Sequence, residues 1–204
     1  MTEANRSSTD LGALILQNRH TGEYLELRRF QPKAGDVWLE IRGSLPPEGR
    51  GPPLHKHLCE DEGGTVIIGK LAAIVNNESI VANAGESAFF PRGSYHRWWN
   101  PGETKLEFVG FVRPVVDLDR FLQAVFEVVN AGPENRPSLF YMAHVLRRHR
   151  VTQAARLMPP AVQGILFECC FWIGTLFGFY RGTTWPGCPE KCIGAPTFPE
   201  PPQR

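Results

Sequence analysis

Two short blocks of sequence concentrate histidine and glutamate among turn-forming residues, and no other feature constrains this chain as strongly. The first block spans residues 49–69 (GRGPPLHKHLCEDEGGTVIIG) and the second spans residues 85–100 (GESAFFPRGSYHRWWN). Together they hold three of the six histidines, His55, His57 and His96, and the first block also holds Glu62. A fold that brings the two blocks together would gather three imidazoles and one carboxylate in one place.

The spacing within the blocks predicts that these four side chains converge. In a strand, residues i and i+2 point to the same face, so His55 and His57 share one side. Glu62 follows a short turn and can return to that side, and His96 arrives on a strand distant in sequence. Three imidazoles and one carboxylate suit Fe(II), Mn(II), Ni(II), Co(II), Cu(II) or Zn(II) better than Ca(II) or Mg(II). A lone His-x-His is more often a surface strand or a buried histidine, and the third histidine and the carboxylate weaken that alternative.

The two blocks resemble the two motifs of the cupin superfamily, in particular the single-domain, quercetin-dioxygenase-like cupins with a type 2 conserved barrel. The motifs have the forms G-x5-H-x-H-x(3,4)-E-x6-G and G-x5-P-x-G-x2-H-x3-N. All their fixed positions are matched here: Gly49, His55, His57, Glu62, Gly69, Gly85, Pro91, Gly93, His96 and Asn100. The resemblance implies a jelly-roll barrel and one divalent transition metal, with Fe(II) favoured, held by the three histidines and Glu62. Glu60 is the substitute for Glu62, and Cys59 is expected to pack rather than to bind metal.

Short strands cut by turns are predicted from Leu11 to Val112, and helical periodicity takes over after Pro114. We expect strands at 12–17, 23–27, 36–41, 65–68, 71–75, 78–81, 87–91, 96–100 and 106–112. We expect helices at 118–129, with Asp117 as the N-cap, at 138–150 and at 160–180. The predicted fold class is therefore mostly β, a double-stranded β-helix (cupin jelly-roll barrel) at 11–114 followed by a C-terminal α-helical extension packing on it at 115–184. Residues 1–10 are expected to be disordered, and residues 185–204 to form a Pro-rich irregular tail.

The apolar run at 165–180 (ILFECCFWIGTLFGFY) bears on assembly. It is shorter than the roughly 20 residues of a spanning helix, so we expect no transmembrane span. Burial against the barrel or in a homodimer is favoured, with membrane-surface contact as the alternative. The formal net charge of +1 gives no reason to expect nucleic acid as a partner. No apolar signal segment is present and a disulfide framework is not expected, although the role of Cys188 and Cys192 stays open, so a cytoplasmic location is expected.

Aromatic residues near the histidines are expected to line a pocket for a small-molecule substrate. Phe90, Tyr95 and Trp98 form that aromatic rim. An inward Arg42 would bind a substrate carboxylate or phenolate, although the alternating apolar residues of its strand are the default inner face. The expected ligand is apolar, aromatic or polyketide-like, and Glu62 is the expected catalytic base. A dioxygenase is favoured over a non-redox isomerase, decarboxylase, dehydratase or cyclase, and over a non-enzymatic metal-stabilised binding module.

Overall fold

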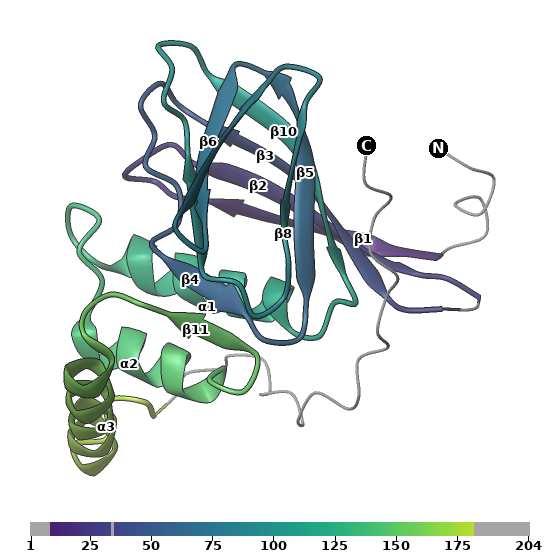
Figure 1. Ribbon diagram of the computed structural model, residues 1–204. Coiled ribbons are helices and arrows are strands. Elements are labelled where there is room, and N and C mark those ends of the chain that lie inside the picture. The colour runs from purple at the N-terminus through teal and green to yellow at the C-terminus, as the bar shows by residue number, and fades with distance from the viewer. Residues whose placement is uncertain (1–8, 34, 182–204) are drawn as a thin grey trace.

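The computed structural model describes residues 9–33 and 35–181, which form two antiparallel sheets and three helices (Figure 1). The first sheet has the strand order β1 (Thr9–Gln17), β2 (Tyr24–Gln31), β3 (Trp38–Leu45), β10 (Leu106–Arg113), β5 (Asp61–Ile68) and β8 (Ser87–Phe90). The second has the order β11 (Gln153–Ala155), β4 (His55–His57), β9 (His96–Trp99), β6 (Lys70–Val75) and β7 (Glu78–Asn83). The sheets enclose a cupin-type barrel, so the predicted fold class is confirmed.

Alternation along β2 and β3 builds the barrel core. Leu25 and Leu27 of β2 are buried, and so are Leu39 and Ile41 of β3. Each such side chain contributes about 1.5–3 kcal/mol on burial. The residues between them face the other way, which is the period-2 pattern of a sheet with one face on the core. The apolar residues of β3 therefore form its inner face, as the default interpretation of the sequence predicts.

Turn residues of the two blocks hold the strand ends in place. Gly69 (φ 82°) and Gly93 (φ 78°) adopt left-handed conformations, which glycine reaches without a Cβ clash. The backbone N–H of Gly93 donates to the carbonyl of His57 over 2.7 Å, so the turn before β9 is tied to the end of β4. The buried Asn100 side chain donates to the Pro46 carbonyl at 2.8 Å and closes the far end of β9.

Three helices follow the barrel: α1 (Leu118–Ala131), α2 (Leu139–Arg148) and α3 (Pro160–Leu176). Figure 1 shows α1 beneath one end of the barrel, with α2 and α3 farther from it. Leu118 and Phe126 of α1 belong to the barrel core. The helices α2 and α3 pack on each other in a separate small core. One strand, β11, returns from this extension to pair with β4, so the predicted boundary near Pro114 does not divide two structurally independent parts.

The start of α1 corrects one expectation. Asp117 precedes the helix, but its side chain makes no capping hydrogen bond. The carboxylate of Glu60 accepts the first backbone N–H groups instead, at 2.6 Å from Val116 N, 3.1 Å from Asp117 N and 3.3 Å from Leu118 N. A helix N-terminus favours a negative group wherever that group comes from in the sequence. The cap of α1 is therefore supplied by the barrel.

The helix α3 leaves much of its apolar surface exposed. It ends at Leu176 and buries Phe167, Cys170 and Gly174, whereas Ile165, Trp172 and Leu176 are 70%, 60% and 80% exposed. The expected burial of this run against the barrel is not observed, since α3 packs on α2. Within residues 9–33 and 35–181, no helix combines the length and the apolar character that crossing a bilayer demands. The expectation of disorder at residues 1–10 is wrong for Thr9 and Asp10, which pair with β2 as the start of β1. Residues 1–8, the tail at 185–204 and Cys188 and Cys192 lie outside the described residues.

Candidate metal centre

The four predicted ligands come together at one end of the barrel. His55 and His57 lie on β4, and His96 lies directly opposite His55 on the paired strand β9. Glu62 reaches the same point from β5 in the other sheet. One ligand atom from each of these residues lies within 4.8 Å of all the others. The two sequence blocks thus meet as their spacing predicts, with one sheet supplying nitrogens and the other a carboxylate oxygen.

All three imidazoles turn the same nitrogen toward this cluster. In each ring Nδ1 makes a hydrogen bond to a carbonyl-type oxygen, and such an oxygen only accepts, so Nδ1 carries a proton. The other nitrogen, Nε2, is then left to point inward. The acceptors are Pro53 O for His55 at 2.8 Å, Gln153 Oε1 for His57 at 2.5 Å and Ser94 O for His96 at 3.1 Å. A hydrogen bond from the second ring nitrogen is what fixes the tautomer and orientation of metal-binding histidines in other proteins.

The charges in the cluster favour an ionised carboxylate. Oε2 of Glu62 lies 2.9 Å from Nε2 of His57 and 3.4 Å from Nε2 of His96. Burial opposes ionisation of Glu62, but the hydrogen bond with His57 and the charges of the two imidazoles outweigh it and hold the pKa of Glu62 far below its usual range. Burial and the neighbouring imidazoles lower the pKa of His55 to about 3, so its Nε2 keeps a free electron pair near neutral pH. For these two residues they are the protonation states that metal ligands need. At His57 burial is outweighed by the hydrogen bond and charge of Glu62, which raise the pKa of that imidazole.

The donor set fits a divalent transition metal. Nε2 of His96 is buried without a hydrogen-bond partner, and a buried polar atom left in this way calls for an explanation. An ion between the three imidazoles and Glu62 would supply the missing partner. Nitrogen-rich sites with one carboxylate suit iron, manganese, nickel, cobalt, copper or zinc. The cluster is therefore a candidate metal site.

The two alternative ligands from the sequence lie outside this cluster. Glu60 is fully buried on the other side of His57, where backbone N–H groups of the α1 start and the Gln153 amide donate to it. Burial raises the pKa of Glu60, although His57 and the donors act against that rise. Cys59 is buried and disulfide-bonded, so it has no thiolate to offer. The expectation that the cysteines form no disulfide does not hold for Cys59, whereas Cys169 and Cys170 are free.

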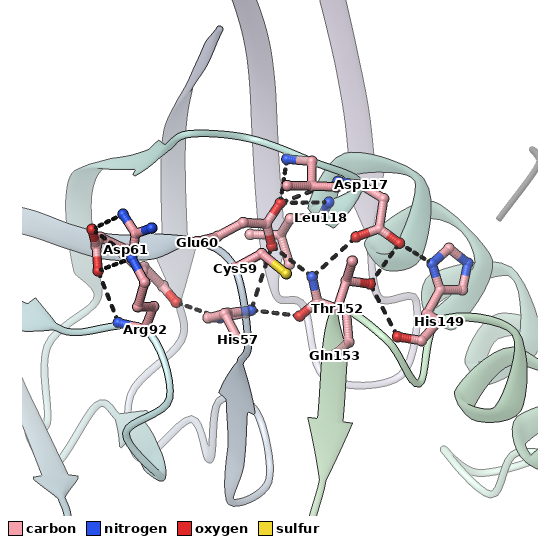
Figure 2. Close-up of polar contacts among 12 residues, drawn as sticks. His57, Cys59, Glu60, Asp61, Arg92, Asp117, Leu118, His149, Thr152 and Gln153 are labelled. Carbon is pink, nitrogen blue, oxygen red and sulfur yellow. Dashed lines mark hydrogen bonds and ion pairs between the residues drawn. The ribbon is translucent and has the colours of Figure 1, made fainter. Parts of the chain in front are cut away.

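Behind His57 lies a buried polar network that the sequence did not predict (Figure 2). Gln153 of β11 sits between His57 and two carboxylates, and its Nε2 lies 2.6 Å from Glu60 Oε2 and 3.3 Å from Asp117 Oδ1. Asp117 also accepts from His149 Nδ1 at 2.5 Å and from Thr152 Oγ1 at 2.9 Å. The segment around Gln153 carries no strong strand pattern, and a three-residue strand is too short for periodicity to reveal. Only the contact with β4 identifies it.

An apolar cavity of about 70 Å³ adjoins the ligands. Phe90 and Trp98 line it, as the sequence predicts, and the Phe90 ring stacks on His96 with ring centroids 4.8 Å apart. Most of the remaining wall is aliphatic or aromatic: Leu25, Ile41, Val66, Leu71, Ala88, Phe108, Leu118 and Leu122. Liquid water occupies about 30 Å³ per molecule, so the enclosed space holds a small group, and a larger ligand would extend toward the rim at His55 and Pro52.

Arg42 and Tyr95 do not line this cavity, which corrects two of the predicted pocket residues. Arg42 lies on the outer face of β3, where its side chain is 59% exposed and pairs with Glu40 at 3.0 Å. Its neighbour Ile41 takes the inward position, because successive strand residues point to opposite faces. Tyr95 precedes β9 and lies under the cations of Lys56 and Arg156, at 4.7 Å and 5.6 Å from its ring centroid.

The cavity contains a second carboxyl group that no sequence pattern singles out. Glu23, in the turn before β2, lines the same cavity as Glu62. Burial raises the pKa of Glu23 to about 7, because an apolar environment disfavours the charged form. The cavity therefore holds one carboxyl group that stays ionised and one whose pKa is raised to about 7.

The comparisons with known proteins agree with the barrel. Residues 42–112 match the family model described as a cupin domain, and this segment contains all four candidate ligands. An oxidoreductase named iacF, from Pestalotiopsis fici, is 35% identical over 79 residues, which cover 37% of this chain. The match spans only 39% of that relative's own length.

Solved structures similar to this chain include an RmlC-like cupin from Shewanella frigidimarina. It has 17% identity and a TM-score of 0.42, and the match covers 56% of this chain and 96% of that one. A salicylate 1,2-dioxygenase mutant from Pseudoaminobacter salicylatoxidans has 17% identity and a TM-score of 0.34, with 37% and 21% covered. Both scores are low, and neither likeness bears on the reaction.

Proposed function

We propose that this chain is a metal-dependent cupin enzyme that acts on an apolar, aromatic or polyketide-like small molecule, with dioxygenase-type chemistry and dioxygen as the second substrate. The single observation that carries the proposal is the meeting of three inward Nε2 atoms and one ionised carboxylate beside an apolar cavity. The similarity to an oxidoreductase over 79 residues supports the redox class.

The proposed role of the ligands is to hold one divalent ion through His55, His57, Glu62 and His96. When bound, such an ion supplies a Lewis acid and, if it is Fe(II) or a similar metal, a redox centre. Fe(II) is the favoured ion, and manganese, nickel, cobalt, copper or zinc are the alternatives.

The protein groups have separate roles in this proposal. Glu62 accepts a proton from a substrate hydroxyl at its carboxylate oxygen, because it is the ligand carboxylate that lines the cavity. Phe90 and Trp98 bind the apolar part of the substrate and exclude water from the cavity. The low dielectric of such a site strengthens the charge interactions within it.

A non-redox isomerase, decarboxylase, dehydratase or cyclase is the second candidate, and Glu23 is the observation that favours it. A carboxyl group with a raised pKa and an ionised carboxylate line the same cavity, and enzymes use two such groups as acid and base. Such a pair suits reactions that move protons without consuming oxygen.

Oxygen consumption separates the two candidates. Protein loaded with Fe(II) is mixed with a panel of polyphenols and enolisable polyketides, aerobically and anaerobically, and substrate loss and oxygen uptake are both followed. The proposal predicts substrate loss coupled to oxygen uptake and none without oxygen. Turnover without oxygen would favour the non-redox candidate, and tight binding without turnover under either condition would favour the non-enzymatic binding module.

Two variants test the residue roles. Glu62→Gln keeps an oxygen ligand but removes the base, so it is expected to retain much of its metal and to lose activity about 10²-fold or more. Trp98→Ala is expected mainly to raise KM. The matched control is Trp99→Ala, the next residue of β9, which does not line the cavity. A native rate in Glu62→Gln would leave Glu62 as a ligand only, and equal effects of the two tryptophan variants would remove Trp98 from the substrate site.

We also propose that a second copy of the chain covers the exposed apolar face of α3, which gives a homodimer. The control for Leu176→Glu is Val81→Glu, since Val81 is 60% exposed on β7, away from α3. Light scattering after gel filtration should give a dimer for the native chain and for Val81→Glu, and a monomer for Leu176→Glu. A native monomer that binds vesicles through α3 would favour the membrane-surface alternative.

A further inference from the structure

The segment that follows the barrel supplies a strand to the sheet that carries the histidines. β11 pairs antiparallel with β4, with Gln153 opposite His57 and Ala155 opposite His55. Two further backbone hydrogen bonds fix the register, from Leu58 N to Thr152 O and from Arg156 N to Leu54 O, both at 2.7 Å. Residues directly opposite each other in an antiparallel pair place their side chains on the same face. Gln153 is therefore held beside His57 by the backbone, independently of its own side-chain contacts.

The Gln153 amide fits its position in only one orientation. Its Oε1 lies 2.5 Å from His57 Nδ1, and its Nε2 lies 2.6 Å from Glu60 Oε2. The opposite orientation would set the amide oxygen against the carboxylate oxygen of Glu60 and the NH₂ group against an N–H of His57. Because a carboxylate accepts and does not donate, the surrounding groups fix which end of the amide is which. The amide oxygen therefore faces the imidazole.

The amide also satisfies both of its neighbours without adding a charge. A side chain here must accept from His57 and donate toward Glu60 and Asp117. A glutamate would add a third carboxylate beside two buried ones, and an apolar residue would leave polar groups on both sides without partners. Gln153, His57 and Glu60 are each at least 97% buried, so water does not replace the lost contacts.

We propose that Gln153 is a positioning residue for the metal centre, which holds the His57 imidazole with Nδ1 protonated and Nε2 turned to the ligand cluster. The inference rests on the proposed function, because it assigns a role in a metal site. The extension is then part of that site: β11 delivers the amide, and Asp117, held by His149 and Thr152, anchors its other end (Figure 2). Partners of this kind set the orientation and basicity of metal-binding histidines.

The test compares Gln153→Met with Gln163→Met. Gln163 is a partly buried glutamine of the extension. Its side chain donates to the Ala155 carbonyl at 2.7 Å and accepts from the Leu157 N–H at 2.9 Å, and it has no hydrogen bond to His57. Zn²⁺ affinity is measured by competition with a chelator, and the thermal unfolding of each metal-free variant is measured beside it. Gln153→Met is expected to bind Zn²⁺ about 10–100-fold more weakly than the native chain. Gln163→Met is expected to keep native affinity.

A second measurement needs no variant. Nitrogen-15 NMR of the native chain loaded with Zn²⁺ reports which nitrogen of His57 binds the metal and which carries the proton. We expect ligation through Nε2 and a slowly exchanging proton on Nδ1. Ligation through Nδ1 would overturn the inference, even if Gln153→Met failed to fold. Native affinity in a folded Gln153→Met would also overturn it, whereas a native chain that binds no Zn²⁺ or Fe(II) would instead refute the proposed function.

Discussion

His55 and His57 stand two residues apart on the same strand, yet the structure supports them in different ways. His55 is partly exposed at the rim, and its Nδ1 bonds the carbonyl of Pro53, two residues before it. His57 is buried, and its Nδ1 bonds Gln153, 96 residues later in the chain. One histidine thus depends on its own loop and the other on the helical extension. A short sequence motif can therefore specify a ligand without specifying what orients it.

The contrast extends to the neighbouring carboxylates. Glu62 faces the imidazoles, whereas Glu60 faces away and binds the backbone N–H groups that begin α1. Residues 55–62 therefore connect the metal centre on one side with the extension on the other. Removal of the extension would take away the backbone N–H groups and the Gln153 amide that donate to Glu60.

The largest expected effect comes from truncation after Pro114. The truncated chain loses β11, Asp117 and the N–H donors to Glu60, while the contact between His55 and Pro53 remains. Core surface next to Leu118 and Phe126 would also be exposed, which favours aggregation. We expect little soluble protein, measured as the soluble fraction after expression. A soluble, monomeric barrel that binds metal as tightly as the full chain would break the contrast between the two histidines.

A smaller effect separates the two histidines directly. His57→Ala leaves the buried oxygen of Gln153 without a donor, so it is expected to lower the free energy of unfolding of the metal-free chain by about 1–3 kcal/mol. His55→Ala, whose carbonyl partner can reach water, is expected to cost less than about 1 kcal/mol. Chemical denaturation with metal chelated gives both values. Equal losses would show that the network behind His57 adds no stability.

The smallest effect concerns the two carboxyl groups of the cavity, one beside imidazoles and one beside apolar groups. Burial raises the pKa of Glu23 from an ordinary value of 4.5 to about 7. Between these values the folded chain holds a proton that the unfolded chain has lost, so this group makes stability fall as pH rises.

Glu23→Gln should remove that dependence. Between pH 5 and pH 8 the free energy of unfolding of the variant is expected to rise by about 1–2 kcal/mol relative to that of the native chain. This is less than the full pKa shift of Glu23 would give, because the side chain is partly exposed. Glu86→Gln, at an exposed turn, is the control for a loss of charge. The free energy of unfolding is measured against pH for each chain. Parallel curves for native protein and Glu23→Gln would mean that Glu23 is solvated.

The sequence predicted those features that depend on local spacing. Period-2 alternation located the barrel strands, and the two blocks located His55, His57, Glu62 and His96, because a strand fixes which side chains share a face. The assignment of these residues as metal ligands stays a prediction. Arg42 was the alternative to the apolar inner face of its strand, and Tyr95 was included as an aromatic residue next to His96; neither lines the cavity.

The network behind His57 could not be predicted in the same way. Gln153 lies on a three-residue strand, and its contact with His57 arises from pairing between segments 96 residues apart. Asp117 has the residue type and position of an N-cap, yet Glu60 takes that role from the barrel. The packing of α3 could not be predicted either, because an apolar helix pattern does not determine which surface covers the helix.

The most direct test of the account is a metal titration of three purified chains. Native protein, His57→Ala and a variant with both His55→Ala and His57→Ala are stripped with chelator, titrated with Co²⁺ or Zn²⁺, dialysed and analysed for bound metal, with folding checked by circular dichroism. The account predicts about one ion per native chain, loss of the ion in His57→Ala and none in the double variant. Full occupancy in the folded double variant would contradict it.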